Sequence, residues 1–371
     1  MAEAPRARLH FTGRAGLAQL IAALAAAGYR VVGPRMRDYA IVYEEIENVA
    51  ELPVGWTDQQ EAGYYRLARN HKETFFDFNL GPQSWKKFLH PPSLRLLAAE
   101  RSGDGFRLAE QDEPPTRYAL LGVRACELAA IRVQDRVLLG DQYIEPHYQA
   151  RRRNIFIVAV QCSRAAPTCF CASLGTGPRI EGGFDLALTE LREGFLVQAG
   201  SGLGAAMLEK IEHSPASEQH CREAEQLIAA VEAQIVRRLD TRDIARRLYE
   251  AGEHPHWEVV ARRCLACGNC TMVCPTCFCT TVEDTSNVRG DRAERWRRWD
   301  SCFTEAFSYI HGGSVRMSVK SRYRQWLTHK LAAWLDQFDM FGCVGCGRCI
   351  VWCPAKIDLT EEVKQLLAAP A

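Results

Sequence analysis

Hydrophobic and polar residues recur with two different periods along the N-terminal two-thirds of the chain. Apolar residues at helical spacing predict an amphipathic helix over residues 17–24, ended by Gly28. Helical spacing also covers residues 127–139, and two further helices are expected over residues 217–251, split near Leu239. Short apolar runs that predict strands cover residues 29–32, 39–43, 118–123 and 155–160. Because apolar runs alternate with helices, we expect residues 1–250 to form an α/β or α+β domain around a parallel or mixed sheet.

The composition is that of an ordinary folded protein with one unusual feature. Of 371 residues, 47% are hydrophobic and 25% are charged, and the net charge is +1. These values exclude a disordered or collagen-like chain and give no global signature of nucleic-acid binding. No apolar stretch reaches the roughly 18 residues of a membrane-spanning helix, and residues 17–27 are not followed by a cleavage site, so we expect a cytoplasmic protein without membrane insertion. The unusual feature is the 16 cysteines, which in a reducing compartment are more often metal ligands than disulfides.

Two cysteine runs share the spacing C-x-x-C-x-x-C-x-x-x-C followed by proline, which is the bacterial ferredoxin pattern. In that pattern three thiolates of a run bind one [4Fe–4S] cluster, and the fourth binds the other cluster. We therefore predict a first cluster on Cys264, Cys267, Cys270 and Cys353, and a second on Cys343, Cys346, Cys349 and Cys274. Structural zinc is the alternative, but zinc sites usually separate their cysteine pairs by roughly a dozen residues or more.

A long spacer separates the two runs, and its pattern predicts helices. Residues 296–311 and 323–338 carry apolar side chains at three- and four-residue spacing, with Gly312 and Gly313 between them. We therefore expect residues 255–371 to form an α-helical ferredoxin domain with two clusters. Basic residues outnumber acidic ones between Arg289 and Lys330. The alternatives are RNA binding and contact with a partner protein, but we expect these cations to offset the negative charge of the clusters, without nucleic-acid binding.

A further set of cysteines follows the two best strand candidates. Cys126 comes three residues after the run 118–123, and Cys162 two residues after the run 155–160. If the two strands are parallel neighbours, both cysteines lie at the carboxyl edge of the sheet, where α/β folds place their sites. We predict a third metal site on Cys126, Cys162, Cys169 and Cys171, with a [4Fe–4S] cluster favoured over zinc. Free cysteines that merely pack in the core are the alternative.

The pentapeptide Pro-Thr-Cys-Phe-Cys occurs twice, at residues 167–171 and 275–279. Its second copy places Cys277 and Cys279 directly after the first ferredoxin run, where they either compete with Cys274 or bind something else. Cys302 is equally ambiguous, whereas Cys221 lies in a charged helical stretch and is expected to be incidental. The sequence leaves the roles of Cys277, Cys279 and Cys302 open.

Together these motifs resemble the iron–sulfur beta subunits of cytoplasmic sulfhydrogenases, a family that includes the iron–sulfur electron-transfer subunits of anaerobic sulfite reductases. The resemblance is carried by GVRACELAAI, RRNIFIVAVQCSRAAPTCFCASLGTGP, CLACGNCTMVCPTCFCTTVED, RRWDSC and CVGCGRCIVWCP. It covers most of the chain from about residue 118 onward, and much of the region before it matches no motif. It implies a chain that relays electrons between a partner module and a flavin- and NAD(P)-binding subunit. The partner module is either the small and large subunits of a nickel–iron hydrogenase or a sulfite reductase subunit.

No nucleotide-binding or hydrolase motif accompanies the cysteines. No G-x-G-x-x-G follows a predicted strand, and the chain has neither a Walker A loop nor a G-x-S-x-G elbow. We assign no catalytic residue and expect a subunit of an oxidoreductase complex without substrate turnover of its own. The alternative is a catalytic iron–sulfur enzyme that transforms a small sulfur compound at the N-terminal cysteine site. Three thiolates there would leave one iron open to a substrate, whereas four would not.

Overall fold

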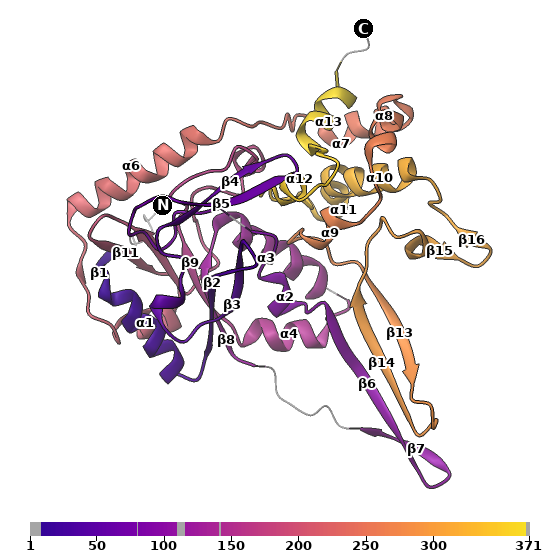
Figure 1. Ribbon diagram of the computed structural model, residues 1–371, viewed down its shortest axis with the longest axis horizontal. Coiled ribbons are helices and arrows are strands. Elements are labelled where there is room, and N and C mark those ends of the chain that lie inside the picture. The colour runs from indigo at the N-terminus through magenta and orange to yellow at the C-terminus, as the bar shows by residue number, and fades with distance from the viewer. Residues whose placement is uncertain (1–8, 80, 110–115, 141, 369–371) are drawn as a thin grey trace.

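A mixed sheet organises the N-terminal region in the computed structural model of the chain, which describes residues 9–79, 81–109, 116–140 and 142–368 (Figure 1). Its strands are β1 (Leu9–Gly13), β2 (Arg30–Arg37), β3 (Ala40–Glu45), β8 (Tyr118–Val123), β9 (Phe156–Val160), β10 (Leu186–Glu190), β11 (Gly194–Ala199) and β12 (Ser214–Pro215). The eight strands follow the order β12-β1-β11-β10-β9-β8-β2-β3. β10, β9, β8 and β2 pair in parallel, and the remaining pairs are antiparallel.

Helices cover both faces of this sheet. The side chains of β9 alternate between the faces, as expected of a strand buried on both sides. Phe156 and Val158 belong to a core that includes Leu20 of α1 (Ala15–Ala26), whereas Ile157 packs with Leu128 of α3 (Ala125–Leu138) on the other side. The longer helices that remain in this region are α4 (Pro146–Arg153), α5 (Gly202–Leu208), α6 (Glu218–Gln234) and α7 (Ile244–Glu250).

The mixed α/β architecture predicted for the N-terminal region is confirmed. The helix expected over residues 17–24 is part of α1, and the strands expected at 118–123 and 155–160 are β8 and β9. The two helices expected over residues 217–251 are α6 and α7. β8 and β9 are parallel neighbours, so their carboxyl ends meet at one edge of the sheet.

Short helices dominate the chain after residue 255. They are α8 (His256–Arg263), α9 (Asn269–Met272), α10 (Val319–Thr328), α11 (Trp334–Phe338), α12 (Arg348–Val351) and α13 (Leu359–Leu366). A π-helical turn, η5 (His329–Ala333), joins α10 to α11, so the helix expected over residues 323–338 is present. Trp257, Leu327, Leu331 and Ile350 contribute to the core between these helices. None of the described helices is long and apolar enough to cross a membrane.

The helix expected over residues 296–311 is wrong. This segment contains the end of β14 (Arg292–Trp299), the turn η4 (Glu305–Ser308) and the start of a small hairpin of β15 (Tyr309–Ile310) and β16 (Gly313–Ser314). β14 lies between β13 (Thr280–Ser286) and β6 (Ser93–Ser102). Pairing with a strand so much earlier in the chain leaves no mark on local periodicity, and this pairing decides the conformation.

The four-stranded sheet β13-β14-β6-β7 projects from the body as an arm, with β7 (Gly105–Ala109) at its outer edge (Figure 1). Arginines of β14 pair with carboxylates of β13, Arg295 with Asp284 and Arg298 with Glu283, each at 2.7 Å. The arm combines segments from both sides of the boundary expected near residues 250–255. The division into domains 1–250 and 255–371 therefore stays a prediction.

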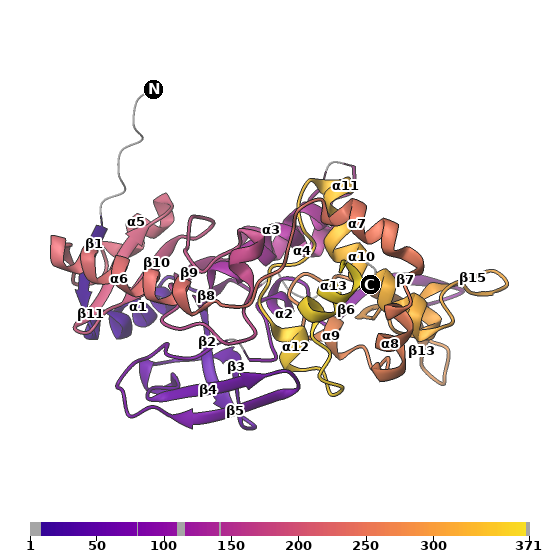
Figure 2. The same cartoon turned by 90° about the horizontal axis from the view of Figure 1, so that it is seen from above.

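A second hairpin, β4 (Trp56–Glu61) and β5 (Tyr64–Arg69), extends from the N-terminal region toward α12 (Figure 2). At its tip the Gly63 amide donates a hydrogen bond to the Ile350 carbonyl at 3.1 Å. The Tyr65 ring lies against Trp352, with 5.1 Å between ring centroids. The hairpin therefore contacts the segment that carries the second cysteine run. The remaining short elements are η1 (Val49–Glu51), α2 (Lys86–Leu89), η2 (Cys171–Leu174) and η3 (Ala251–Glu253).

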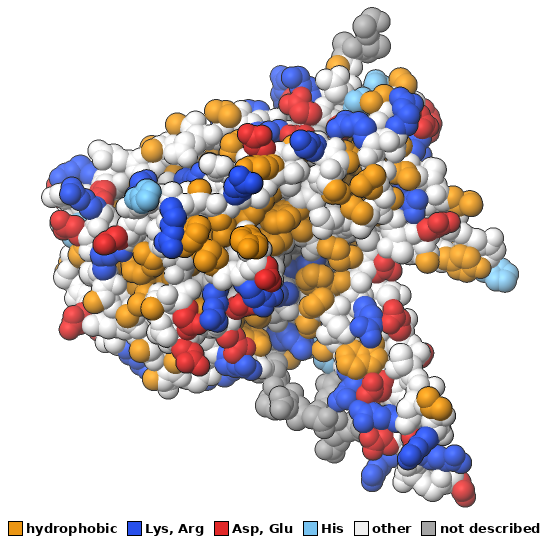
Figure 3. Space-filling model, in the orientation of Figure 1, with side chains coloured by type: hydrophobic (Ala, Val, Ile, Leu, Met, Phe, Trp, Pro, Cys, Tyr) orange, Lys and Arg blue, Asp and Glu red, His pale blue; other side chains and the backbone are white. Residues whose placement is uncertain are grey.

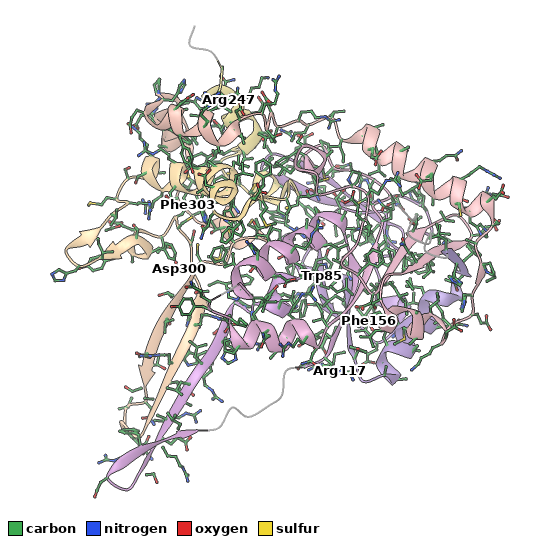
Figure 4. The ribbon with its side chains drawn as sticks, turned by 180° about the vertical axis from the view of Figure 1, so that it is seen from behind. Trp85, Arg117, Phe156, Arg247, Asp300 and Phe303 are labelled. Carbon is green, nitrogen blue, oxygen red and sulfur yellow. The ribbon has the colours of Figure 1, made fainter. Side chains whose placement is uncertain are left out.

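A buried ion pair joins the N-terminal sheet region to the second cysteine run. Arg348 donates from Nη2 to Glu127 Oε1 at 2.6 Å, and both side chains are only 1% exposed. The other carboxylate oxygen accepts hydrogen bonds from Trp85 Nε1 at 2.9 Å and from the Tyr43 hydroxyl at 3.1 Å. Trp85 lies at the centre of the molecule when it is seen from behind (Figure 4). Because Glu127 lies on α3 and Arg348 begins α12, the pair fixes the second run against α3.

The substitution Glu127→Gln tests this connection. It leaves the Arg348 guanidinium buried without a counter-charge, which we expect to lower the free energy of unfolding by about 3–5 kcal/mol. Urea unfolding of the anaerobically purified protein measures the change. Glu250→Gln is the matched control, because Glu250 pairs with Arg246 at the surface, and loss of such a pair costs less than about 1 kcal/mol. Equal unfolding midpoints for the two variants would contradict the prediction.

Candidate metal centres

The first predicted set of cysteines lines one cavity. Cys264, Cys267, Cys270 and Cys353 all border it, although Cys353 comes from the other run. Its remaining wall is largely apolar and includes Phe303, Tyr323, Trp326, Ile357 and Leu359. Phe303 lies among the C-terminal helices (Figure 4). The structure thus brings together the crossed set that the ferredoxin spacing predicts.

The two ferredoxin loops have the same backbone conformation at equivalent positions. The residue two places after the first cysteine of each run donates its amide to that cysteine's sulfur, at 3.4 Å for Cys264 and 3.5 Å for Cys343. This residue and the one directly after the second cysteine of the run both have a left-handed backbone conformation. They are Ala266 and Gly268 in the first run, and Gly345 and Gly347 in the second. Each loop therefore directs an amide at a sulfur, as hydrogen bonding to a cluster thiolate requires.

The second predicted set gathers around a buried lysine. Cys349 interacts electrostatically with Cys343, Cys346 and Cys274, so the fourth thiol again comes from the other run. Lys330, in the π-helical turn η5, donates from Nζ to Cys274 Sγ at 3.2 Å. The Cys277 thiol and the Lys330 ammonium hold the pKa of Cys274 well below its usual value. The Cys274 side chain is therefore prepared to act as a thiolate.

The third predicted set lines a second cavity, at the edge of the sheet. Cys126, in the first turn of α3, and Cys162, after β9, border it together with Cys169 and Cys171 from the following loop. Arg124 also borders this cavity, and its guanidinium donates to the carbonyls of Gln161 and Phe76. The structure thus brings together all four thiols that the strand argument placed at this edge.

The three sets are neighbours in a row. Cys349 of the second set also borders the cavity of the first, and Cys346 of the second set borders the cavity of the third. The loop of the second run lies directly on the loop of the third set, where the Phe170 amide donates to the Gly345 carbonyl at 2.9 Å. A Cβ atom on Gly345 would come within 2.6 Å of the Cys171 amide nitrogen. Only glycine permits this approach, so Gly345 sets the separation of the second and third sites.

Burial raises the pKa of most of these thiols. It raises that of Cys343 and that of Cys169 to about 12, because a thiolate loses its hydration inside the protein. The iron ions of a cluster would supply the positive charge that stabilises the thiolates, and their binding would displace the thiol protons. In the described part of the chain no three His, Cys, Asp or Glu side chains converge as one metal ion would require. The thiolates of a cubane stand farther apart, because each binds a different iron.

Buried cations lie beside each set, and the sequence identified only some of them. From the basic segment, Lys330 reaches the second set, and Arg322 is close enough to Cys264 to favour its thiolate form. Arg297, by contrast, pairs with Glu145 at 3.0 Å. Arg124 and Arg348 were not predicted as functional residues, although each lies within two residues of a predicted cysteine ligand. Their position beside cysteine ligands is the sequence signal that could have identified these two arginines.

Four cysteines lie outside the three sets. Cys279 and Cys302 are hydrogen-bond partners, whereas the Cys277 thiol is the partner of Cys274. Lys330 acts electrostatically on Cys277, Cys279 and Cys302. Cys221 lies apart from them on α6, where it borders a pocket between this helix and the sheet. Its expected incidental role stays a prediction.

The third site is tested by the substitution Cys162→Ser. If four thiolates hold a cubane there, we expect the variant to lose about four irons per chain with the matching sulfide. Iron, sulfide and zinc analysis of anaerobically purified protein measures this. Cys221→Ser serves as the control and should keep the wild-type iron content. Loss of zinc, or an unchanged metal content in Cys162→Ser, would exclude a third cluster.

The close approach of the two loops is tested by Gly345→Ala. Gly345 has φ of +62°, and its new Cβ would meet the backbone of Phe170 and Cys171. We expect loss of iron from the second and third sites together. Gly103→Ala is the control, because Gly103 has φ of +61° but nothing within 4 Å of its Cβ position. It carries the left-handed strain alone, of about 1–2 kcal/mol. Similar iron contents for the two variants would show that the approach is not required.

The chain is similar to known iron–sulfur proteins. Residues 263–357 match the family model of the 4Fe-4S dicluster domain, which covers both ferredoxin runs. The chain is also 35% identical over 348 residues to sulfhydrogenase 2 subunit beta of Pyrococcus furiosus, a match that covers 91% of this chain and 92% of that protein. No solved structure gives a significant match. The protein is therefore an iron–sulfur protein with [4Fe–4S] clusters, and it belongs to the family of the sulfhydrogenase beta subunits.

Proposed function

We propose that the chain is the electron-transfer subunit of a multi-subunit oxidoreductase, and that it relays electrons between a nickel–iron hydrogenase module and a flavin- and NAD(P)-binding subunit. The observation that carries the proposal is the row of three cysteine sets. Cys349 lies between the first and second sets, and Cys346 between the second and third. Clusters on these ligands would be neighbours, so an electron would cross the protein in short steps.

The number of thiols at each site supports transfer rather than catalysis. Four cysteines border the cavity of the third set, as many as a cubane has irons. With all four as ligands, no iron would be open to a sulfur compound. This favours a carrier over the alternative of an enzyme with a substrate site at the N-terminal cysteines.

One end of the row reaches the surface. Cys267 of the first set is exposed, and its neighbour Leu265 is 67% exposed. Apolar side chains also gather on the face of the molecule seen in Figure 3, between the sheet region and the C-terminal helices. The third set lies at the other end of the row, at the edge of the sheet. We propose that the Cys267 side is where electrons pass to or from a partner subunit.

A flavoprotein partner follows from the chemistry of the donor. NAD(P)H gives up two electrons as a hydride, whereas an iron–sulfur cluster accepts one electron at a time. A flavin converts one kind of transfer into the other, and the chain has no glycine motif for a dinucleotide. The name of the Pyrococcus furiosus relative favours a hydrogenase module over a sulfite reductase module on the other side. A nickel determination on the native complex, purified through a tag on this chain, distinguishes the two modules.

The relay is tested with the isolated chain carrying its full clusters. We expect dithionite to reduce the clusters and a viologen dye to reoxidise them, which shows that they are competent. NAD(P)H alone should produce no dye reduction, and hydrogen should not be consumed. Addition of an NAD(P)H-oxidising flavoprotein should then start dye reduction through the chain. Sustained NAD(P)H oxidation without any flavoprotein would show that the chain has its own nucleotide site and would contradict the relay.

A further inference from the structure

Two hydrogen-bond donors in the wall of the first cavity have no partner in the protein. Tyr323 and Trp326 lie three residues apart on the same face of α10, and both border the cavity of the first cysteine set. Their exposed fractions are only 3% and 4%. Among the described residues, neither the Tyr323 hydroxyl nor the Trp326 indole nitrogen has a hydrogen-bond partner. A buried donor without an acceptor is unfavourable, so both groups indicate acceptors that belong in the cavity.

Aromatic packing accounts for the two rings but not for their polar ends. The Tyr323 ring lies 6.2 Å from the ring centroids of both Trp257 and Phe303. The Trp326 ring lies 6.0 Å from Phe303 and 5.5 Å from Tyr323. Trp257 belongs to the same core, yet its indole N–H is paired, because it donates to the Ala251 carbonyl at 2.7 Å. A phenylalanine would provide the same ring contacts at position 323 without an unpaired hydroxyl.

The carboxylate near the Tyr323 hydroxyl is engaged elsewhere. Glu362 acts electrostatically on Tyr323, but its two oxygens lie 2.7 Å from His256 Nε2 and 2.8 Å from Arg263 Nη1. The other groups that act electrostatically on this hydroxyl are three thiols, all of which border the first cavity. The hydroxyl therefore lies among the thiols of the first site without an acceptor of its own.

A cluster in this cavity would bring the missing acceptors. The sulfurs of a [4Fe–4S] cluster accept hydrogen bonds, and such bonds are among the features that set its reduction potential. The reduced cluster carries one more negative charge than the oxidised cluster, so a donor stabilises the reduced form more. Unpaired donors in an otherwise largely apolar wall would therefore favour reduction of the cluster beside them.

We propose that the Tyr323 hydroxyl and the Trp326 indole N–H donate hydrogen bonds to sulfurs of the first cluster and thereby raise its reduction potential. This inference rests on the cluster that the proposed function uses at this site, but on no partner subunit. The first set includes the exposed Cys267. The two donors thus set how readily the cluster nearest the surface accepts an electron.

The test is an anaerobic redox titration of the isolated full-length chain, followed by electron paramagnetic resonance. We expect Tyr323→Phe and Trp326→Phe each to keep the wild-type iron content. At a fixed potential, each should lower the ratio of reduced to oxidised first cluster about tenfold, which is about 59 mV for a one-electron couple. The spectral component altered in Cys267→Ser identifies the first cluster. Water that entered the space left by Trp326→Phe would raise the potential, so a decrease reports the lost hydrogen bond.

Two control variants remove the same groups where the donor is already paired. Tyr148→Phe removes a buried hydroxyl that donates to Asp135 at 2.7 Å, and Trp257→Phe removes the indole N–H that donates to Ala251. Both should leave the potential of the first cluster unchanged. A potential that is unchanged in Tyr323→Phe and Trp326→Phe at full iron content overturns the proposal, as do equal shifts in the controls.

Incorporation of 3-fluorotyrosine at position 323 gives an answer even if the phenylalanine variants fail to fold. Fluorine makes the phenol more acidic and therefore a stronger donor, while the ring and its hydroxyl remain. We expect the potential of the first cluster to rise, opposite to the effect of Tyr323→Phe. An unchanged or lower potential overturns the proposal.

The potential and the relay fail independently. The titration uses no partner, whereas the relay is measured by dye reduction with an added flavoprotein. Unchanged potentials in a chain that relays electrons would contradict only the role of the two donors. The expected shifts in a chain that does not relay electrons would support that role and contradict the proposed function.

Discussion

The loop of the second cysteine run is fixed by the ion pair between Arg348 and Glu127, and the arrangement of the sites depends on it. Arg348 lies between Cys346 and Cys349, while Glu127 directly follows Cys126. One contact of 2.6 Å between two buried groups therefore positions ligands of two different sites. A buried pair of this kind contributes little net stability compared with apolar packing, but it does not tolerate the loss of one partner. The ion pair therefore matters for position more than for stability, because it holds the second cysteine run against α3.

The negative charge of the clusters explains why so many cations are buried in this protein. A thiolate-ligated cubane is an anion, and its sulfurs cannot lie in an apolar interior without compensation. Arg124, Arg322, Lys330 and Arg348 each lie close enough to a predicted ligand to favour its thiolate form. Amides of the two ferredoxin loops add hydrogen bonds to Cys264 and Cys343. The net charge of the whole chain is close to zero, yet positive charge is needed locally beside the cysteine sets.

The sequence predicted which cysteines lie close together better than it predicted the framework around them. A spacing of two or three residues between ligands is local information, so the crossed assignment of Cys353 and Cys274 could be made without a structure. Cys126 and Cys162 could be placed at one edge of the sheet because β8 and β9 are buried on both sides and form continuous apolar runs in the sequence, whereas the metal site there stays a prediction. The strand β14 was not predicted, because it pairs with β6, which lies more than half of the chain length earlier in the sequence. The contacts of Lys330 and Arg348 also depend on tertiary packing, and no motif announces them.

The central position of the second run has a consequence for how the protein assembles. Each predicted set takes ligands from segments that are far apart in sequence, so a bound cluster closes a long loop and contributes to the free energy of folding. Before a cluster binds, burial keeps thiols such as Cys343 protonated, and Lys330 then has Cys274 as its anionic neighbour. The loop from Cys343 to Cys349 borders the first and third cavities as well as forming the second site. Disorder in that loop would therefore disturb the first and third sites as well as the second. Disorder near the exposed Cys267 would disturb only one neighbouring site. We therefore expect an empty second site to disturb both of its neighbours.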